Sequence, residues 1–185
     1  MRLVARLMLR CMRWDPDPKG AYPLKSARCV VIVAPHTSNW DFVIGVLYRS
    51  ALGLQKAHYL GKKELFNPWL GWFFRWLGGT PVDRHASQNM VEQVVQLFNR
   101  HNEYILALSP EGTRKKVDRL RTGFYQIAYQ ARVPIVMVAL DFENRQVIFA
   151  EPFMPTGNMQ KDFAHILSFF RPIKGKYPEQ GLMHL

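Results

Sequence analysis

Two short, β-branched apolar runs constrain the fold of this chain more than any other feature. Residues 28–34 (RCVVIVA) and 134–140 (PIVMVAL) contain almost no polar side chains, so we expect strands that are buried on both faces. Further strands are predicted at residues 56–60, 80–83, 103–108 and 146–150. Capping residues and helical spacing predict helices at residues 38–52, 90–98, 122–132 and 163–170. This alternation predicts an α/β fold with a mainly parallel central sheet flanked by helices.

Length and charge narrow the class of protein. The 185 residues suit one domain, 1–185, and a hydrophobic share of 48% excludes a disordered chain. A net charge of +11 favours polyanionic partners: nucleic acid, an anionic membrane surface or phosphorylated substrates. The two cysteines, Cys11 and Cys29, provide neither a disulfide framework nor a metal-binding spacing, which suits a reducing compartment. No run of about 18 apolar residues occurs, so we expect no transmembrane helix.

The first 14 residues have an amphipathic pattern. On a helical wheel, Arg2, Arg6, Arg10 and Arg13 fall within an arc of about 80°, and apolar residues cover the opposite side. This pattern is typical of a helix that lies in a membrane interface. It is equally typical of a helix that packs on its own domain with solvated arginines. Residues 15–20, which contain two prolines and a glycine, are expected to end the helix and act as a linker.

The segment 64–77 is dense in aromatic side chains and holds three of the five tryptophans. Pro68 is expected to start a short helix in it. Such a helix cannot span a bilayer, but aromatic residues are favoured at the water–lipid boundary. Taken alone, the segment slightly favours a core helix. Because the N-terminal helix also has a pattern typical of membrane binding, the two segments together strengthen the interpretation that segment 64–77 lies at the membrane interface.

His36 and Asp41 follow the first buried strand. An imidazole can accept a proton near neutral pH, and a buried carboxylate at its other ring nitrogen fixes the tautomer and stabilises the imidazolium. Residues five apart are about 140° apart on a helix, so the pair can meet only if His36 lies in the loop and Asp41 in the first helical turn. Ser38, as an N-cap, favours that arrangement. The alternative is a capping aspartate beside an incidental surface histidine.

A second loop, residues 110–114 (PEGTR), follows the strand expected at 103–108. Gly112 allows the backbone to approach a ligand closely, and Arg114 can hold a phosphate through paired donors. Arg84, after another expected strand, can supply a second clamp. Because loops at the carboxyl ends of parallel strands meet at one edge of a sheet, we expect His36, Arg84 and Glu111 to converge. The alternative is a solvated basic loop, which we favour for Lys115, Lys116 and Arg119.

Other chemistries have weaker support in the sequence. Ser38 and Ser109 lack a nucleophile elbow, and Cys29 is expected to be packed in a strand. The base is therefore expected to activate a substrate hydroxyl directly. No recognised metal-ligand spacing exists, so no metal is expected. Nucleic-acid binding has only the charge and the aromatic residues to support it and is not expected.

Four blocks occur in order along the chain: His36…Asp41, residues 79–84 (GTPVDR), 109–114 (SPEGTR) and 133–135 (VPI). Together they resemble the motifs of the glycerolipid acyltransferase family, whose best-known members are the 1-acylglycerol-3-phosphate (lysophosphatidate) acyltransferases. Ser109 stands where the family usually has a large apolar residue, and Pro81 replaces a β-former. The chain is also shorter than many members.

The resemblance implies transfer of a fatty acyl group from a thioester to a lysophospholipid hydroxyl, in phospholipid biosynthesis and on a glycerol-3-phosphate acyltransferase-like fold. By similarity, His36 is the general base and Asp41 its orienting partner. The residues implied to bind the glycerol phosphate end are Arg84, Glu111, Gly112, Thr113 and Arg114. The donor is acyl-coenzyme A or acyl carrier protein, and no other cofactor is implied. Because the substrates reside in the bilayer, the enzyme is expected to be peripheral, on the cytoplasmic face of the cell membrane.

Two alternatives stay open at this point. One is a non-catalytic basic module that binds anionic membranes or nucleic acid, with binding that falls steeply with salt. The other is an enzyme of the same chemistry that acts on a non-phosphorylated acceptor, for which Arg84 and Arg114 matter much less than His36.

Overall fold

The computed structural model describes residues 1–20, 22, 27–69, 71–82 and 90–185. Its centre is a seven-stranded sheet with the order β1-β7-β6-β2-β5-β3-β4. The strands are β1 (Lys19–Gly20), β2 (Arg28–Ala34), β3 (Ala57–Lys62), β4 (Gly79–Val82), β5 (Tyr104–Leu108), β6 (Ile135–Asp141) and β7 (Gln146–Phe149). Strands β6, β2, β5, β3 and β4 are parallel, whereas β7 is antiparallel to β6 and parallel to β1. The predicted α/β class with a mainly parallel sheet is confirmed.

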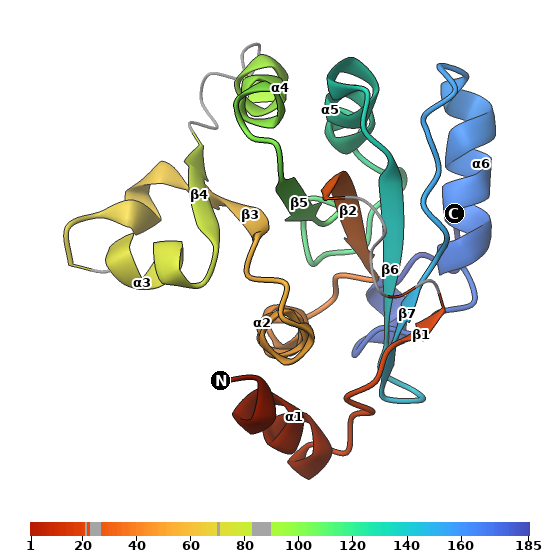
Figure 1. Ribbon diagram of the computed structural model, residues 1–185. Helices are drawn as coiled ribbons and strands as arrows, with labels where there is room; N and C mark the ends of the chain where they lie inside the picture. Colours follow the sequence, from red (N-terminus) through yellow and green to blue (C-terminus); the bar gives the residue numbers. More distant parts are fainter. Residues whose placement is uncertain (21, 23–26, 70, 83–89) are drawn as a thin grey trace.

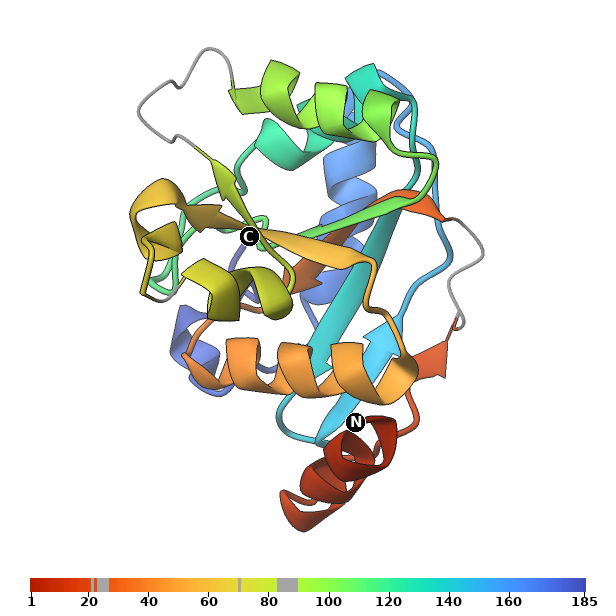
Figure 2. The ribbon, with the colours of Figure 1, turned by 60° about the vertical axis from the view of Figure 1, so that its left-hand side comes forward.

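Helices cover both faces of the sheet (Figure 1, Figure 2). The helices of the described residues are α1 (Arg2–Cys11), α2 (Trp40–Leu52), α3 (Gly71–Trp76), α4 (Met90–Arg100), α5 (Gly123–Ala131) and α6 (Met159–Phe170), with 3₁₀ turns η1 (Lys63–Phe66) and η2 (Pro178–Gln180). Helices α1 and α2 lie on one face, and α4, α5 and α6 lie on the other. Helix α3 lies beside the β3–β4 edge (Figure 1).

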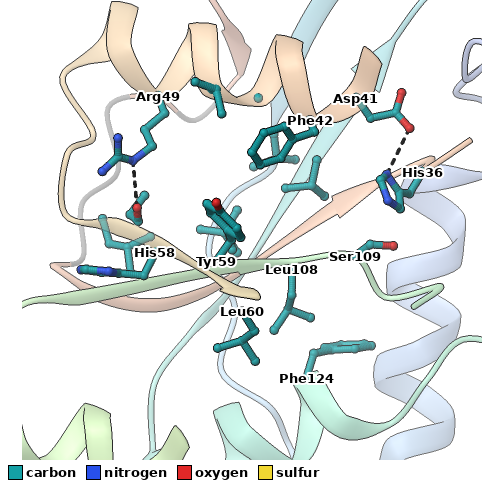
Figure 3. A pocket seen from close by; sticks show the side chains of 18 of the residues that line it. His36, Asp41, Phe42, Arg49, His58, Tyr59, Leu60, Leu108, Ser109 and Phe124 are labelled. Carbon is teal, nitrogen blue, oxygen red and sulfur yellow. Dashed lines mark hydrogen bonds and ion pairs between the residues drawn. The ribbon is translucent and has the colours of Figure 1, made fainter. Parts of the chain in front are cut away.

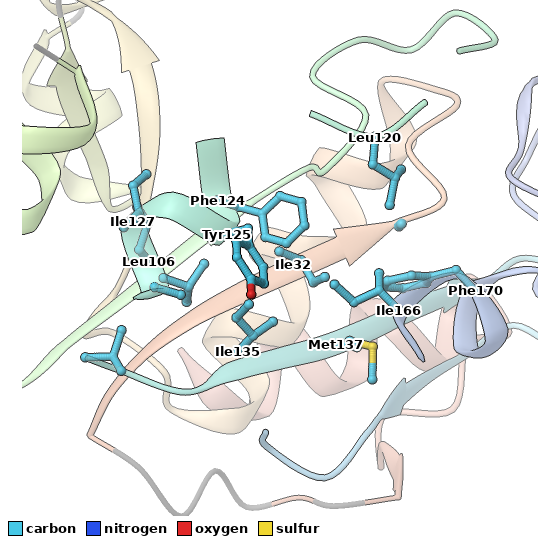
Figure 4. Packing of buried hydrophobic residues seen from close by; sticks show 14 of the residues in the cluster. Ile32, Leu106, Leu120, Phe124, Tyr125, Ile127, Ile135, Met137, Ile166 and Phe170 are labelled. Carbon is cyan, nitrogen blue, oxygen red and sulfur yellow. The ribbon is translucent and has the colours of Figure 1, made fainter. Parts of the chain in front are cut away.

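The central strands owe their position to their apolar composition. Every residue of β6 is buried, and β2 is buried apart from partial exposure at Arg28 and Val33. Alternate side chains of these strands enter two cores. The larger core, on the α4–α6 face, contains Ile32, Ile135 and Met137 among others (Figure 4). Both faces are therefore closed by side chains, as a parallel sheet requires.

The sequence placed most elements to within a few residues, with two differences. The expected linker at 15–20 carries strand β1 at the sheet edge, and the Asp15 N–H donates to the Arg145 carbonyl. Helix α6 starts at Met159, earlier than the expected residue 163, because the Asn158 side chain accepts from the Lys161 N–H and caps an additional turn.

Helix α1 packs on the domain through one side only. Ala5 and Leu9 are buried in the core on the α1–α2 face. Leu3, Val4, Leu7 and Met8 are between 48% and 81% exposed. The helix thus has one apolar side in contact with the protein and a second apolar side that faces outward. No helix of the described residues is long and apolar enough to cross a bilayer.

Candidate active site

His36 and Asp41 are brought together by the end of β2 and the start of α2. His36 lies in the loop that leaves β2, and Asp41 lies in the first turn of α2. The His36 Nδ1 atom is 3.1 Å from Asp41 Oδ2 (Figure 3). The predicted loop-to-helix arrangement is confirmed. It leaves Nε2 of the imidazole free of that carboxylate, so Nε2 is available to exchange a proton with a substrate.

The Asp41 carboxylate is held by the backbone around it. Its side chain is 2% exposed. Oδ2 accepts from the Thr37 N–H and the Ser38 N–H, each at 2.7 Å, and Oδ1 accepts from the Ser38 hydroxyl at 3.0 Å. The Ser38 hydroxyl in turn accepts from the Trp40 N–H at 3.1 Å. The N-cap position of α2 is Asn39, one residue after the predicted Ser38. These donors compensate the buried negative charge and fix the direction in which Asp41 faces His36.

Glu111 lies beneath the same loop and holds the histidine backbone. The His36 N–H lies 2.9 Å from Oε1 and 3.0 Å from Oε2 of Glu111, and the Ser109 hydroxyl donates to Oε2 at 2.9 Å. Glu111 is only 1% exposed. Burial raises the pKa of its carboxyl above the usual value, although the His36 N–H and the Ser109 hydroxyl oppose that rise. In this conformation both oxygens of the Glu111 carboxyl accept hydrogen bonds from groups of the protein.

The basic loop after β5 lies beside the dyad because β2 and β5 are adjacent and parallel, with Ile32 paired to Leu108. Gly112 has a φ of 69°, the left-handed conformation that favours glycine. The loop closes where the Arg121 N–H donates to the Pro110 carbonyl at 2.8 Å. The Thr113 hydroxyl accepts from the Lys115 N–H, a contact within the loop.

An apolar cavity of about 930 Å³ extends from the dyad into the protein. His36, Asp41, Arg114 and Arg121 lie among its lining residues. Much of the remaining lining is apolar and comes from α2, β3, β5 and α5, among other elements. Phe42, Leu60, Leu108 and Phe124 are examples (Figure 3). Its lining includes Tyr59 and Ala107, the last pair between β3 and β5. Its size lies within the range of small-molecule binding sites, about 300–1,000 Å³.

The structure unites most of the predicted site residues. His36, Asp41, Gly112 and Arg114 all line the cavity. Glu111 binds the His36 backbone, and Thr113 lies between Gly112 and Arg114 in the same loop. Arg84, the predicted second clamp, lies outside the described residues.

Three residues belong to the site in the structure although the sequence analysis did not assign them to it. Arg121 lines the cavity because the loop returns to Pro110. Its separation from Gly112 in the sequence gave no indication of this contact. Ser109, a departure from the family motif, donates to Glu111. Thr37 is 3% exposed and lies under the C-terminal segment. The hydroxyl two residues before Glu111 was the available sequence signal for Ser109.

Comparison with known proteins identifies the class to which this site belongs. The model of the Acyltransferase family matches residues 19–141, more than half of the chain. The chain therefore belongs to the acyltransferase family, which confirms the resemblance seen in the sequence. A search of curated proteins found no match.

The fold is also similar to a solved acyltransferase. That structure is the 1-acyl-sn-glycerophosphate (LPA) acyltransferase, PlsC, from Thermotoga maritima. The two chains superpose with a TM-score of 0.59 at 17% sequence identity, over 91% of this chain and 74% of the other. The similarity establishes a shared fold that includes nearly the whole of this chain.

Proposed function

We propose that this acyltransferase moves a fatty acyl group from a thioester to the hydroxyl of a lysophospholipid such as 1-acylglycerol-3-phosphate. One observation carries the proposal: the His36–Asp41 pair lies at an apolar cavity that is also lined by Arg114 and Arg121. A phosphorylated lysolipid acceptor requires a base for its hydroxyl and cations for its phosphate, and an acyl chain requires an apolar space. The acyl thioester, of coenzyme A or acyl carrier protein, is a co-substrate.

The dyad supplies the acid–base chemistry. His36 Nε2 takes the proton of the acceptor hydroxyl while its oxygen attacks the thioester carbonyl carbon. Asp41 keeps the proton on Nδ1 and stabilises the imidazolium that forms. The tetrahedral intermediate then expels the thiolate, which receives the proton from the imidazolium. No covalent enzyme intermediate is needed, because a thiolate is a good leaving group.

The remaining site residues position the substrates and the base. Arg114 and Arg121 provide forked donors for the acceptor phosphate. The apolar lining takes the acyl chain, whose burial contributes about 0.8 kcal/mol per methylene. Glu111 is a positioning residue in this proposal, because it binds the His36 N–H and is covered by protein.

The test is a thiol-release assay with purified protein, palmitoyl-coenzyme A and lipid micelles, with and without lysophosphatidate. We expect acceptor-dependent release that His36→Ala abolishes. His165→Ala is the matched control, since this histidine is exposed and outside the cavity. Full activity in a folded His36→Ala protein contradicts the mechanism.

Further substrates resolve the remaining alternatives. If coenzyme A thioesters give no release, the assay is repeated with acyl carrier protein and a panel of lysolipids. Activity on uncharged acceptors that is unaffected by Arg114→Ala and Arg121→Ala favours a non-phosphorylated acceptor. No activity with any donor, together with salt-sensitive lipid binding, favours the non-catalytic module.

We also propose that the protein binds peripherally to an anionic membrane, at the cytoplasmic face. The outward apolar side of α1 supports this proposal, since Leu3 and Leu7 are 81% and 61% exposed beside the arginine arc. The segment 64–77 adds exposed aromatics: Trp69, Trp72 and Trp76 are 85%, 67% and 56% exposed, which does not suit a core helix. In Figures 1 and 2, α2 lies between α1 and α3.

Vesicle sedimentation tests this association. We expect binding to vesicles that contain phosphatidylglycerol and weaker binding to vesicles of phosphatidylcholine alone. Leu3→Asp with Leu7→Asp should abolish it. Met154→Asp, at an apolar residue on the α5 side that is 52% exposed, should leave it intact. Equal loss in both variants contradicts the assignment of the surface.

A further inference from the structure

The C-terminal segment 171–185 lies over the loop that carries the dyad. It follows α6 and lies outside residues 19–141, the span that the family model matches. Its start is fixed to the β6–β7 turn, where the Phe142 N–H donates to the Lys174 carbonyl at 3.0 Å and Lys174 Nζ is 2.6 Å from Glu143. We call residues 174–185 the strap.

The strap contacts the catalytic loop at Thr37, the residue next to His36. The Tyr177 N–H donates to Thr37 Oγ1 at 3.2 Å. Gly175 is buried against the same side chain: a methyl group at Gly175 would lie 2.8 Å from Thr37 Oγ1 and 2.9 Å from its Cγ2. Gly175 has no left-handed φ, so glycine is needed here for space.

The other end of the strap is anchored in the core and on the basic loop. Leu182 is fully buried in the larger core. His184 Nε2 lies 2.7 Å from the Val117 carbonyl oxygen, which belongs to the loop between Gly112 and Arg121. One segment therefore touches both loops that form the site, and it is held at both ends.

Thr37 connects this contact to the chemistry. Its N–H donates to the Asp41 oxygen that faces His36 Nδ1. A displacement of Thr37 therefore changes the orientation of the Asp41 carboxylate, and misplacement by about 1 Å can cost about 10²-fold in rate. Resting on the proposed function, we propose that Gly175 and Tyr177 are positioning residues, which hold Thr37 so that the His36–Asp41 pair keeps its catalytic geometry.

A steric swap tests this proposal. Gly175→Ala should lower kcat by about 10²-fold and leave the KM values of donor and acceptor nearly unchanged. Thr37→Ala removes the two atoms nearest to the new methyl group and leaves Pro35 Cβ at 3.2 Å. Because Thr37→Ala also removes the acceptor of the Tyr177 N–H, the Thr37→Ala protein is the reference, and Gly175→Ala should lower kcat much less in that background than in wild type. Met183→Ala, at an exposed residue of the same strap, is the control and should have wild-type activity. Circular dichroism and thermal melting establish the folded fraction of each variant.

A spectroscopic measurement keeps the test independent of the substrate. A histidine Nδ1–H bonded to a carboxylate gives a downfield proton resonance, which His36→Ala identifies by its loss. We expect Gly175→Ala to shift or remove this resonance in the wild-type background, and the double variant to match the Thr37→Ala protein. A Gly175→Ala protein that retains kcat and the resonance overturns the proposal, as does an equal loss of kcat from Gly175→Ala in the wild-type and Thr37→Ala backgrounds. Inactivity of the wild-type protein instead overturns the proposed function, and the resonance then still tests the strap.

Discussion

Filling the cavity at Gly45 should shorten the acyl chain that the enzyme accepts. Gly45 lies in α2 and lines the cavity, and a methyl group there would meet no atom within 4 Å. Gly45→Leu therefore adds a branched apolar group to the cavity without a backbone clash. Gly45→Ala is the matched control, expected to gain about 0.5–1 kcal/mol of stability from helix propensity.

The magnitude follows from the methylenes that the new side chain displaces. Beyond its Cβ, leucine adds three carbons, which take the place of about three methylenes of the substrate at about 0.8 kcal/mol each. For a chain that fills the cavity the loss is about 2 kcal/mol, or about thirty-fold in kcat/KM. A short chain that does not reach Gly45 should lose nothing.

The assay compares kcat/KM for octanoyl-, dodecanoyl- and palmitoyl-coenzyme A in wild type, Gly45→Ala and Gly45→Leu. We expect Gly45→Leu to lose activity only with the longer donors. An equal loss at every chain length would show that the substitution disturbs α2 and Asp41. No loss at any length would refute the placement of the acyl chain in this cavity.

Three further results are expected. Burial raises the pKa of the Glu111 carboxyl in the folded protein above 4.5, so the unfolded chain loses this proton at lower pH than the folded protein. Glu111 therefore lowers the free energy of unfolding as the pH rises above 4.5. In denaturation experiments, the free energy of unfolding of Glu111→Gln relative to that of wild type should increase from acidic to neutral pH. Burial raises the pKa of the Cys29 thiol to about 12, whereas Cys11 is exposed; mass spectrometry after iodoacetamide treatment should find only Cys11 modified until the protein is unfolded. Tyr125→Phe removes a hydroxyl that donates to Asp162, and denaturant titration should show a loss of about 1–3 kcal/mol with unchanged kcat.

Local patterns predicted the central strands of the sheet, and the dyad was predicted from its spacing together with the family resemblance. Strands β2 and β6 are apolar except for Arg28 and Asp141 at their ends, so composition was enough to predict their burial on both faces. His36 and Asp41 are close in the chain, and helix geometry alone decided how they could meet. The α/β class and the family followed from such local features.

Features that depend on tertiary contacts could not be predicted in this way. Strand β1 has two residues and exists because β7 offers it an edge. The exposure of the α3 tryptophans depends on where that short helix packs. The contacts of Glu111 with His36 and of Gly175 with Thr37 join residues far apart in the chain, and no local spacing encodes either contact.

The bond between the His36 N–H and Glu111 links residues 75 positions apart, and it has a consequence for how activity appears during folding. Asp41 and its donors form a unit of six consecutive residues that can assemble early. The Glu111 contact requires β2 and β5 to be paired, and such long-range pairing is slow. Enzymatic activity in a refolding experiment should therefore emerge with the completion of the central sheet, after collapse and helix formation have finished.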